Sequence, residues 1–456
     1  MRFSELEGAR VGVWGAGREI ASFASQLERR LGTAQIAVAV FDSEPEQDVG
    51  LLLHSPGVRV VDASQALEAL AGCDVLVRSP GVSIHRPELL ALRHSGLAVT
   101  TATSLWLAEH GAQGVIGVTG TKGKSTTAAL AAHLARAAGY TAALAGNIGV
   151  PALELLDSEP AQVTVLELSS FHIADLASGP QVAVITNLFS EHADWHGSAE
   201  VYRAEKLRIL GLEGVRTAVL RPAELPLARE HPGLRAIAFG AQDGWQVDER
   251  EIALRGEPML ARAQLPLEGA HNALNLCAAL SALEALGLTL PPLPQALSDF
   301  RALAHRLQPV AEQEEILWVD DSISTTPESA LAALASFSDR PIVLIAGGQD
   351  RGQDYGELAH TLTVSGAHVI GVPSTGGRLV AAARDAGLAD THAIEAQDLA
   401  EAVELARELV LPGGVILLSP AAPSYDNYHN FEERGERFQA LAGSMTSLAV
   451  DDLRST

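Results

Sequence analysis

The sequence predicts an α/β protein built from three domains, and three observations lead to this prediction. The chain has 456 residues, too many for a single hydrophobic core. Short apolar runs alternate with amphipathic stretches near the N-terminus, and the same alternation restarts near residue 304. Between these two regions, a glycine- and lysine-rich turn joins a strand-like run to a helix-like run. We therefore expect domains at residues 1–103, 104–303 and 304–456.

The first segment has the pattern of a small parallel sheet with helical stretches between its strands. The expected strands are Val11–Trp14, Ile36–Phe41, Val58–Val61, Asp74–Val77 and Leu97–Thr100. The turn Gly12-x-x-Gly15-x-Gly17 lacks the third glycine of a dinucleotide-binding motif, because Ile20 stands there. A generic nucleotide-fold turn explains it equally well. The glycine turn of the first segment suggests a nicotinamide-dependent oxidoreductase as an alternative. That function would not explain the glycine- and lysine-rich turn of the second segment.

The second segment opens on the most informative stretch of the chain, which predicts a phosphate-binding loop. The β-branched run Val115–Val118 leads into Gly120-Thr121-Lys122-Gly123-Lys124-Ser125-Thr126, and an alanine-rich helical run follows. Glycines let backbone N–H groups close around phosphate oxygens, and the N-terminus of the helix adds partial positive charge. Lys124 is placed to reach the outer phosphates, and Ser125 or Thr126 to offer a hydroxyl to Mg²⁺. An ATP-dependent enzyme is the expected class.

Further polar side chains follow the strands that we expect around this loop. Glu167 ends the apolar run Val163–Leu168 and is suited to hold Mg²⁺, although a solvated glutamate at a strand end is the alternative. His192 lies in a polar cluster after the strand Val182–Asn187 and is the preferred second metal ligand. Ser79-Pro80-Gly81 also follows a strand, at the edge where parallel sheets bind ligands.

Five more positions are candidates for a functional role because of their residue type and place in the sequence. Lys206 lies on a presumed helix, where a lysine is usually solvated. Arg306 stands at the expected domain junction and either clamps a γ-phosphate or bridges the domains. Asp321 opens a hydroxyl-rich loop and is a candidate to bind ribose or metal-bound nucleotide. The helix expected over His271–Leu286 carries Asn272 and Asn275.

Composition excludes several classes of protein. The formal net charge of −24 argues against nonspecific binding to nucleic acid or to an anionic membrane, because both need basic faces. The two cysteines lie in apolar settings far apart in sequence, as expected of free thiols in a reducing compartment. We find no signal-peptide pattern and no apolar run of membrane-spanning length. The expected location is the cytoplasm.

Taken together, the motifs resemble the Mur ligase family in order and spacing. They are GTKGKSTT, GNIGVP, LELSSF, EHADWH, YRAEK, HNALN, HRLQ, DDSIST and LLSPAAPSYDNYHNFEERG. The resemblance spans the whole chain and is strongest to the branch that adds glutamate to UDP-N-acetylmuramoyl-L-alanine (MurD). It implies a Rossmann-like UDP-sugar domain, a central P-loop-type ATPase domain and a Rossmann-like domain that receives the amino acid. It also implies ligation through an acyl phosphate, with ATP and Mg²⁺, in peptidoglycan precursor synthesis by a monomer.

The resemblance also implies roles for individual residues. The loop Gly120–Thr126 would bind the phosphates and Mg²⁺. The catalytic residues would be Lys124, Lys206 and His192. Metal ligands would be Ser125, Glu167, His192 and a carbamylated Lys206. Further ATP contacts would come from Asn272, Asn275, Arg306 and Asp321. The UDP-sugar would meet Ser79, Pro80, Gly81, Asn147 and Ser169, and glutamate would meet Thr325, Arg351, Ser424 and Phe431.

Two departures from the family pattern concern the substrates. The usual glutamine after SSF is His172, which puts that muramoyl contact in doubt. The usual D-S-K-A-T-N loop reads Asp321-Ser322-Ile323-Ser324-Thr325-Thr326, and Arg351 replaces a lysine near the incoming glutamate. The commoner family substrate is D-glutamate, which is our prediction, and the altered loop makes L-glutamate the alternative. A folylpolyglutamate synthase-like ligase is a remote third possibility, because residues 1–103 have the pattern of a UDP-binding domain.

Overall fold

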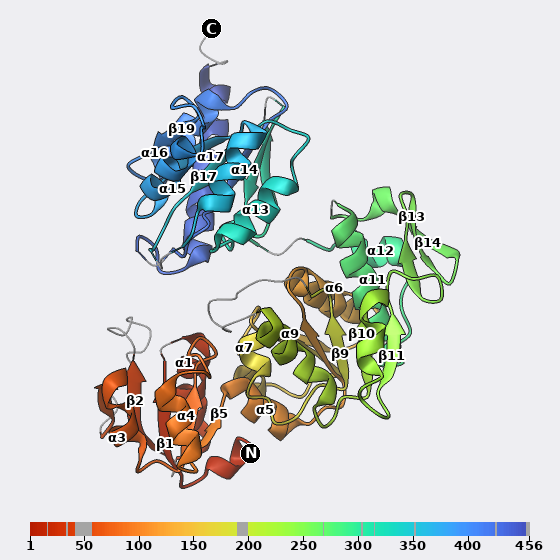
Figure 1. Ribbon diagram of the computed structural model, residues 1–456. Coiled ribbons are helices and arrows are strands. Elements are labelled where there is room, and N and C mark those ends of the chain that lie inside the picture. The colour runs from red at the N-terminus through yellow and green to blue at the C-terminus, as the bar shows by residue number, and fades with distance from the viewer. Residues whose placement is uncertain are drawn as a thin grey trace. The chain divides into compact units, whose positions relative to one another are not determined.

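The computed structural model describes the chain except residues 16, 33–34, 42–56, 189–198, 268, 302–303, 314, 351–352, 425 and 453–456. It divides into two compact units, Met1–Arg301 and Ala302–Thr456. Several parallel sheets covered by helices confirm the predicted α/β class (Figure 1). The further division of the first unit at residue 103 stays a prediction. Within the described residues, no helix has both the length and the apolar character needed to cross a bilayer.

The first unit begins with a five-stranded parallel sheet in the order β3-β2-β1-β4-β5. Its strands are β1 (Arg10–Trp14), β2 (Gln35–Phe41), β3 (Arg59–Asp62), β4 (Val75–Arg78) and β5 (Ala98–Thr100). Its helices are α1 (Arg18–Arg30), α3 (Ala66–Leu70), α4 (Pro87–His94) and α5 (Ala102–His110). The strands read as nearly continuous apolar runs because helices cover both faces of a parallel sheet.

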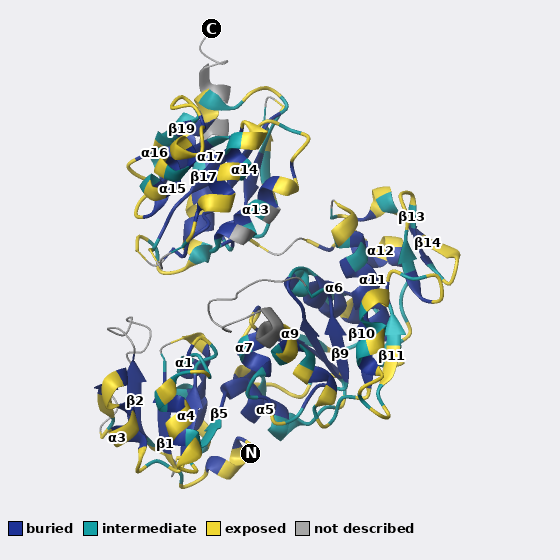
Figure 2. Cartoon of the chain, in the orientation of Figure 1, coloured by how far each residue is buried: buried dark blue, intermediate teal, exposed yellow. Residues whose placement is uncertain are grey.

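A second parallel sheet in the same unit has the order β11-β10-β9-β6-β8-β7. Its strands are β6 (Val115–Thr119), β7 (Ala142–Gly146), β8 (Val163–Glu167), β9 (Val182–Ile185), β10 (Thr217–Leu220) and β11 (Arg235–Ala238). The helices are α6 (Lys124–Ala137), α7 (Ser170–Ile173), α9 (Ala199–Leu207), α10 (Leu225–Ala228), α11 (Ala270–Ala285) and α12 (Leu293–Ser298). One core cluster contains residues of both sheets, with Val13 from the first and Leu166 from the second (Figure 2).

A small antiparallel sheet, not foreseen from the sequence, follows in this unit. It joins β12 (Trp245–Val247), β13 (Glu251–Leu254) and β14 (Glu257–Ala261). Arg255 and Gly256, which connect the last two strands, have φ angles of 51° and 86°. Two consecutive residues with positive φ are typical of a two-residue hairpin turn.

The second unit holds a six-stranded sheet in the order β15-β16-β20-β17-β18-β19. Its strands are β15 (Gln308–Gln313), β16 (Ile316–Asp320), β17 (Ile342–Ala346), β18 (His368–Gly371), β19 (Ala393–Glu395) and β20 (Val415–Leu418). The helices are α13 (Pro327–Ala335), α14 (Gly356–Ser365), α15 (Gly376–Asp385), α16 (Leu399–Leu409) and α17 (Phe431–Asp452). Only β15 pairs antiparallel. The parallel strands therefore direct their carboxyl ends to one edge, where the predicted site residues gather.

Candidate functional site

The predicted phosphate loop joins β6 to α6, as expected, and two of its glycines cannot be replaced without a clash. Gly120 has φ of 140°, and a Cβ there would come within 2.0 Å of Thr186 Oγ1. Gly123 has φ of 80°, and a Cβ would come within 2.3 Å of Asn275 Oδ1. Glycine is the residue that accepts positive φ and such close approach at no steric cost. The second contact brings Asn275 of α11, a predicted ATP contact, against the loop.

Lys124 begins α6, and Ser125 and Thr126 complete the first turn of that helix. The first N–H groups of an α-helix have no partner within the helix and are directed at its N-terminal end. The Lys124 ammonium donates to the carbonyl oxygen of Thr121 at 2.8 Å. The backbone N–H of Lys122 donates to Asn187 Oδ1 at 2.9 Å, which fixes the loop to the end of β9. These hydrogen bonds hold the turn in place at the N-terminus of α6, a position suited to bind a polyphosphate.

Glu167 is a buried carboxylate at the end of β8 and only half satisfied by hydrogen bonds. Its Oε1 accepts from Asn147 Nδ2 at 2.8 Å. Its Oε2 is buried and has no hydrogen-bond partner among the described residues. An unpaired buried carboxylate oxygen is costly unless a cation or donor meets it. The unpaired Oε2 of Glu167 is therefore suited to the predicted role of Mg²⁺ ligand, because Mg²⁺ prefers hard oxygen ligands.

Lys206 lies on α9 and is buried, with an exposed fraction of 2%. Its Nζ donates to the carbonyl oxygen of Gly120 at 2.8 Å, so the side chain extends to the phosphate loop. The sequence alone favoured a solvated lysine here, and the structure places it in the interior instead. The sequence contains only three lysines, Lys122, Lys124 and Lys206. All three lie at or against this loop, and arginine supplies every other basic side chain.

Two predicted residues cannot be placed. His192, the expected second metal ligand, and Arg351, expected near glutamate, lie outside the described residues. The described part of the chain holds no cluster of three or more acidic, histidine or cysteine side chains arranged for a metal. A complete metal site is therefore a prediction that rests on Ser125 and Glu167 together with His192 and a modified Lys206.

The loop Ser79-Pro80-Gly81 is organised by Arg78, a residue that the sequence analysis did not single out. Arg78 ends β4, is fully buried, and pairs with Asp175. Its guanidinium donates to the carbonyl oxygens of Ser79 and Pro80, both at 3.1 Å, and of Val82 at 2.7 Å. It also donates to the carbonyl oxygen of Phe171 at 3.0 Å. The feature of the sequence that could have identified Arg78 is a charged residue at the end of an apolar strand.

In the second unit, Asp321 follows β16 and is buried. Its Oδ1 accepts from the Leu307 N–H at 3.1 Å, and its Oδ2 accepts from the Ser419 hydroxyl at 2.8 Å. Arg306 precedes Leu307, and its Nε is buried without a hydrogen-bond partner in the described structure. Burial raises the Asp321 pKa to about 6, although the hydrogen bonds and the Arg306 charge oppose this rise.

This pKa gives a pH-dependent prediction. The carboxyl ionises near its ordinary value in the unfolded chain but only near pH 6 in the folded one. Stability contributed by the protonated form is therefore complete below about pH 4 and is lost as the pH rises through 6. We expect Asp321→Asn to gain up to about 3 kcal/mol over wild type between pH 4 and 7.5. Hydrogen exchange of the β16 amides across this range measures the difference, and a constant difference would contradict the assignment.

Three residues predicted to bind the glutamate substrate lie within the described part of the second unit, which also contains the buried Arg434. Thr325 follows β16, Ser424 follows β20, and Phe431 begins α17. The guanidinium of Arg434, on α17, donates to the Ser322 carbonyl at 2.8 Å, to the Ala422 carbonyl at 3.1 Å and to the Gly347 carbonyl at 3.4 Å. One side chain thus ties together the three loops at the carboxyl ends of β16, β17 and β20. In the sequence, Arg434 is noted only as part of the motif LLSPAAPSYDNYHNFEERG.

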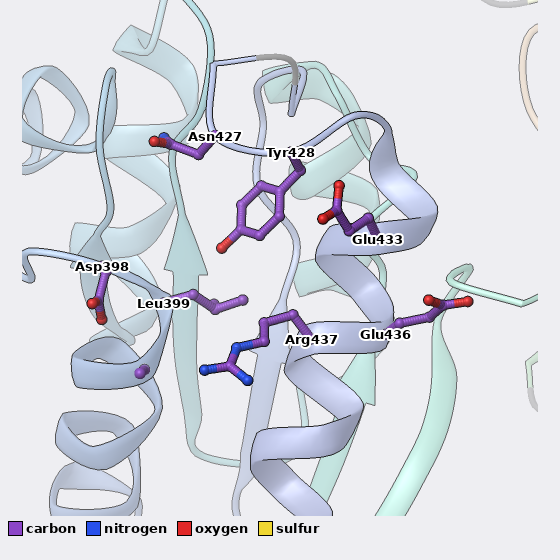
Figure 3. Close-up of a pocket in the computed structure, with 8 residues that line it drawn as sticks. Asp398, Leu399, Asn427, Tyr428, Glu433, Glu436 and Arg437 are labelled. Atoms are coloured by element: carbon purple, nitrogen blue, oxygen red, sulfur yellow. The ribbon is translucent and has the colours of Figure 1, made fainter.

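A pocket of about 500 Å³ in the second unit lies apart from these predicted residues. Figure 3 shows the labelled lining residues, which come from the start of α16, from α17 and from the loop before α17. The lining residues are Asp398, Leu399, Ala400, Asn427, Tyr428, Glu433, Glu436 and Arg437. Three carboxylates against one guanidinium make it unsuited to an anionic amino acid, and no predicted site residue lines it.

The α/β fold, with a glycine-rich turn between strand β6 and helix α6, is typical of the class of multidomain enzymes that bind nucleotides. Comparison with known families identifies residues 118–283 as a Mur ligase middle domain and residues 305–422 as a Mur ligase glutamate ligase domain. The chain belongs to the Mur ligase family. It is accordingly an ATP-dependent ligase that forms amide bonds, as the resemblance implied.

Relatives and solved structures agree with this family. A UDP-N-acetylmuramoyl-L-alanine–L-glutamate ligase of Micromonospora sp. is 42% identical, covering 96% of this chain and 97% of its own. One from Xanthomonas axonopodis pv. citri is 41% identical, covering 97% of both chains. The structure of UDP-N-acetylmuramate-alanine ligase from Thermotoga maritima matches 96% of this chain and 100% of its own, with a TM-score of 0.59 at 20% identity. MurF ligase from the same organism, in complex with ADP, matches 98% of this chain and 97% of its own, with a TM-score of 0.57 at 17% identity.

Proposed function

We propose that this chain couples ATP cleavage to the addition of L-glutamate to UDP-N-acetylmuramoyl-L-alanine, a step in peptidoglycan precursor synthesis. The observation that carries the proposal is the identity of 41–42%, over nearly the whole chain, with ligases whose names specify these substrates. The sequence favoured D-glutamate, as the commoner family substrate, and kept L-glutamate as the alternative. The names of the relatives support the alternative, and we adopt it.

The chemistry explains why ATP is needed. A carboxylate is a poor electrophile until one of its oxygens becomes part of a leaving group. An oxygen of the alanyl carboxylate attacks the γ-phosphorus of ATP, the bond to the bridging oxygen breaks, and ADP leaves. The glutamate amine then attacks the acyl carbon, the nitrogen loses a proton, and inorganic phosphate leaves. Both steps gather negative charge, which fixed cations offset.

In this proposal the first unit supplies most of the machinery. Lys124 and the N–H groups of the loop hold the outer phosphates, and Asn272 and Asn275 border the nucleotide. Asn275 Nδ2 donates to Asn272 Oδ1 at 3.1 Å, so the two amides orient each other. Ser125, Glu167, His192 and a carbamylated Lys206 would hold Mg²⁺, which when bound neutralises phosphate charge. Arg306 and Asp321 remain predicted nucleotide contacts on the resemblance.

The proposal also covers the partners and the location of the protein. A monomer in the cytoplasm, without nucleic acid or membrane as partner, is consistent with the net charge of −24. Ser79, Pro80, Gly81, Asn147 and Ser169 would bind the UDP-sugar, and Thr325, Arg351, Ser424 and Phe431 would bind glutamate.

Phosphate release with ATP and UDP-N-acetylmuramoyl-L-alanine, supplied with L- or D-glutamate, tests the substrate directly. We expect turnover with L-glutamate and discrimination against the D-enantiomer of up to about 10⁴-fold, because an inverted stereocentre leaves buried polar groups unpaired. Turnover with D-glutamate alone would contradict the proposed enantiomer and leave the ligase assignment intact. No phosphate release with either enantiomer would contradict the acceptor.

A triple replacement tests whether the loop after β16 sets this preference. Ile323→Lys, Ser324→Ala and Thr326→Asn together should shift the ratio of kcat/KM values toward D-glutamate. Thr326 caps α13 by accepting from the Ser329 N–H at 3.3 Å, and asparagine is an equally good cap, so the helix should stay formed. An unchanged ratio in a folded variant would remove the loop from the specificity argument.

A further inference from the structure

Two side chains at the end of β9 hold one residue of the predicted phosphate loop. The Asn187 amide accepts from the Lys122 N–H at 2.9 Å and donates to the Lys122 carbonyl oxygen, also at 2.9 Å. The Thr186 hydroxyl donates to the same carbonyl oxygen at 2.6 Å and lies 3.2 Å from the Thr119 carbonyl oxygen. The backbone oxygen of Asn187 accepts from the Thr121 N–H at 3.0 Å. The N–H and the carbonyl of Lys122 therefore both face the end of β9.

The orientation of the Asn187 amide follows from its partners. A backbone N–H can only donate and a backbone carbonyl can only accept, so Oδ1 faces the Lys122 N–H and Nδ2 faces the Lys122 carbonyl. The loop lies directly against the strand end, since a Cβ at Gly120 would come within 2.0 Å of Thr186 Oγ1. Thr186 is buried and Asn187 is half-buried. These hydrogen bonds are therefore largely shielded from water.

The same hydrogen bonds set the direction of the peptide group between Lys122 and Gly123. This peptide is trans and planar, so its carbonyl and its N–H point in opposite directions. The Lys122 carbonyl faces β9, and the Gly123 N–H therefore faces away from β9. The preceding peptide group has the reverse orientation, with the Thr121 carbonyl facing away and accepting from the Lys124 ammonium at 2.8 Å. The Gly123 N–H and the Lys124 ammonium thus lie on the side of the loop that faces away from β9.

Residue type alone does not fix this peptide group. Gly123 has φ of 80°, and glycine adopts positive and negative φ about equally well. A reversal of the peptide group changes mainly ψ of Lys122 and φ of Gly123, and it places the carbonyl oxygen where the N–H was. Anions bind where successive backbone N–H groups point at them, and a carbonyl oxygen in that place repels them. The direction of this one peptide group therefore decides whether the loop attracts a phosphate.

We propose that Asn187, assisted by Thr186, is a positioning residue for phosphoryl transfer. It holds the peptide group between Lys122 and Gly123 with the N–H toward the outer phosphates of ATP and the carbonyl away from them. The inference rests on the proposed function for the place of ATP at this loop. The Gly123 N–H then adds to the first N–H groups of α6 and to Lys124 as a fixed donor. Asn187 acts through the backbone, and its own side chain contacts no substrate.

Three variants separate the hydrogen bonds from the shape of the side chains. Asn187→Leu keeps the branched shape and adds no charge, but it loses both the acceptor and the donor. Thr186→Val likewise keeps the shape and loses the hydroxyl, whereas Thr186→Ser keeps the hydroxyl. Calorimetry with ADP and Mg²⁺ should show about tenfold weaker binding for Asn187→Leu and about threefold weaker binding for Thr186→Val. Thr186→Ser should stay within about twofold of wild type.

The choice of nucleotide tests whether the effect is on the outer phosphates. AMP lacks these phosphates, so its affinity, measured by competition, should change by less than about twofold in Asn187→Leu. Affinity for UDP-N-acetylmuramoyl-L-alanine should also stay at the wild-type value. A general loosening of the unit would weaken all three ligands. Equal losses for ADP and AMP would overturn the inference.

Gln181→Ala is the matched control. Gln181 directly precedes β9, and its Oε1 accepts at 2.8 Å from the N–H of Gly114, which directly precedes β6. Strands β6 and β9 are neighbours in the sheet, so this hydrogen bond joins them at the edge opposite to the phosphate loop. Its loss removes a comparable bond between a side chain and the backbone, and ADP affinity should be unchanged. Equal weakening in Gln181→Ala and Asn187→Leu would mean a general structural effect and would overturn the inference.

A crystal structure of the wild-type complex with ADP observes the peptide group directly. The Gly123 N–H should donate to a phosphate oxygen, with the Lys122 carbonyl still on Asn187. In Asn187→Leu the peptide group should be reversed or present in both orientations. A wild-type complex with the Lys122 carbonyl facing the phosphates would overturn the inference.

Failure of the inference differs from failure of the proposed function. Wild type that does not bind ADP contradicts the proposed nucleotide site itself. Wild type that binds ADP, with Asn187→Leu binding it equally well, overturns only the inference. If Asn187→Leu does not fold by thermal unfolding, Thr186→Val and Thr186→Ser decide. The valine variant should bind ADP about threefold more weakly than the serine variant, and equal affinities would overturn the inference.

Discussion

Replacing Lys124 by alanine is expected to lower the rate of phosphate release by about 10²–10³-fold or more. The transferred phosphoryl group and both reacting oxygens are anionic, and Lys124 is the fixed cation at the mouth of the loop. Its side chain is half-exposed, so it contributes little to packing, and its ammonium donates to the carbonyl oxygen of Thr121. The variant should therefore fold normally and bind the nucleotide-sugar as wild type does.

Arg136→Ala is the control for this variant. Arg136 belongs to the last turn of the same helix and bonds the Ala142 carbonyl at 3.0 Å, far along α6 from the phosphate loop. Losing this charge should leave kcat unchanged. Steady-state phosphate release, with thermal unfolding as the folding check, measures both variants. Turnover of Lys124→Ala above about a hundredth of wild type would remove Lys124 from the phosphate site.

Lys206→Ala is expected to inactivate the enzyme to a similar degree. Lys206 is buried with its amine on the Gly120 carbonyl, and a carbamate formed there would place an anionic oxygen ligand beside the phosphate loop. Added bicarbonate should not restore activity, because alanine has no amine to carbamylate. Acetate or formate should restore part of it, because a small carboxylate can occupy the vacated space and bind the cation.

The scarcity of lysine makes the modification measurable. Only Lys122, Lys124 and Lys206 can carry a lysine carbamate, so mass spectrometry under mild conditions assigns it among three peptide positions. Arg203→Ala, an exposed change one turn earlier on α9, should keep full activity. Full activity of Lys206→Ala, or an unmodified Lys206 in active enzyme with metal bound, would contradict the assignment.

Much of the fold followed from local patterns. The five strands of the first sheet, the strand–loop–helix of Val115–Ala137 and the helix over Ala270–Ala285 lie where the sequence predicted them. Periodicity and turn chemistry act between residues a few positions apart, and a single sequence contains that information. The hairpin at Arg255-Gly256 was missed because its strands are short and each begins with a charged residue, Glu251 in β13 and Glu257 in β14.

The residues of the candidate site also divide into those that local sequence patterns predicted and those that depend on tertiary packing. The sequence by itself predicted the turn between β6 and α6, because glycines, lysine and hydroxyls at fixed spacing favour a local conformation. Only the tertiary structure decided that Lys206 is buried against that loop, since the helix pattern alone favoured solvent. The hydrogen bond between Glu19 and His172 joins residues that are 153 positions apart in the sequence. Such contacts depend on how the sheets and helices pack. The burial of Asp321, which raises its pKa, likewise arises only when the chain has packed.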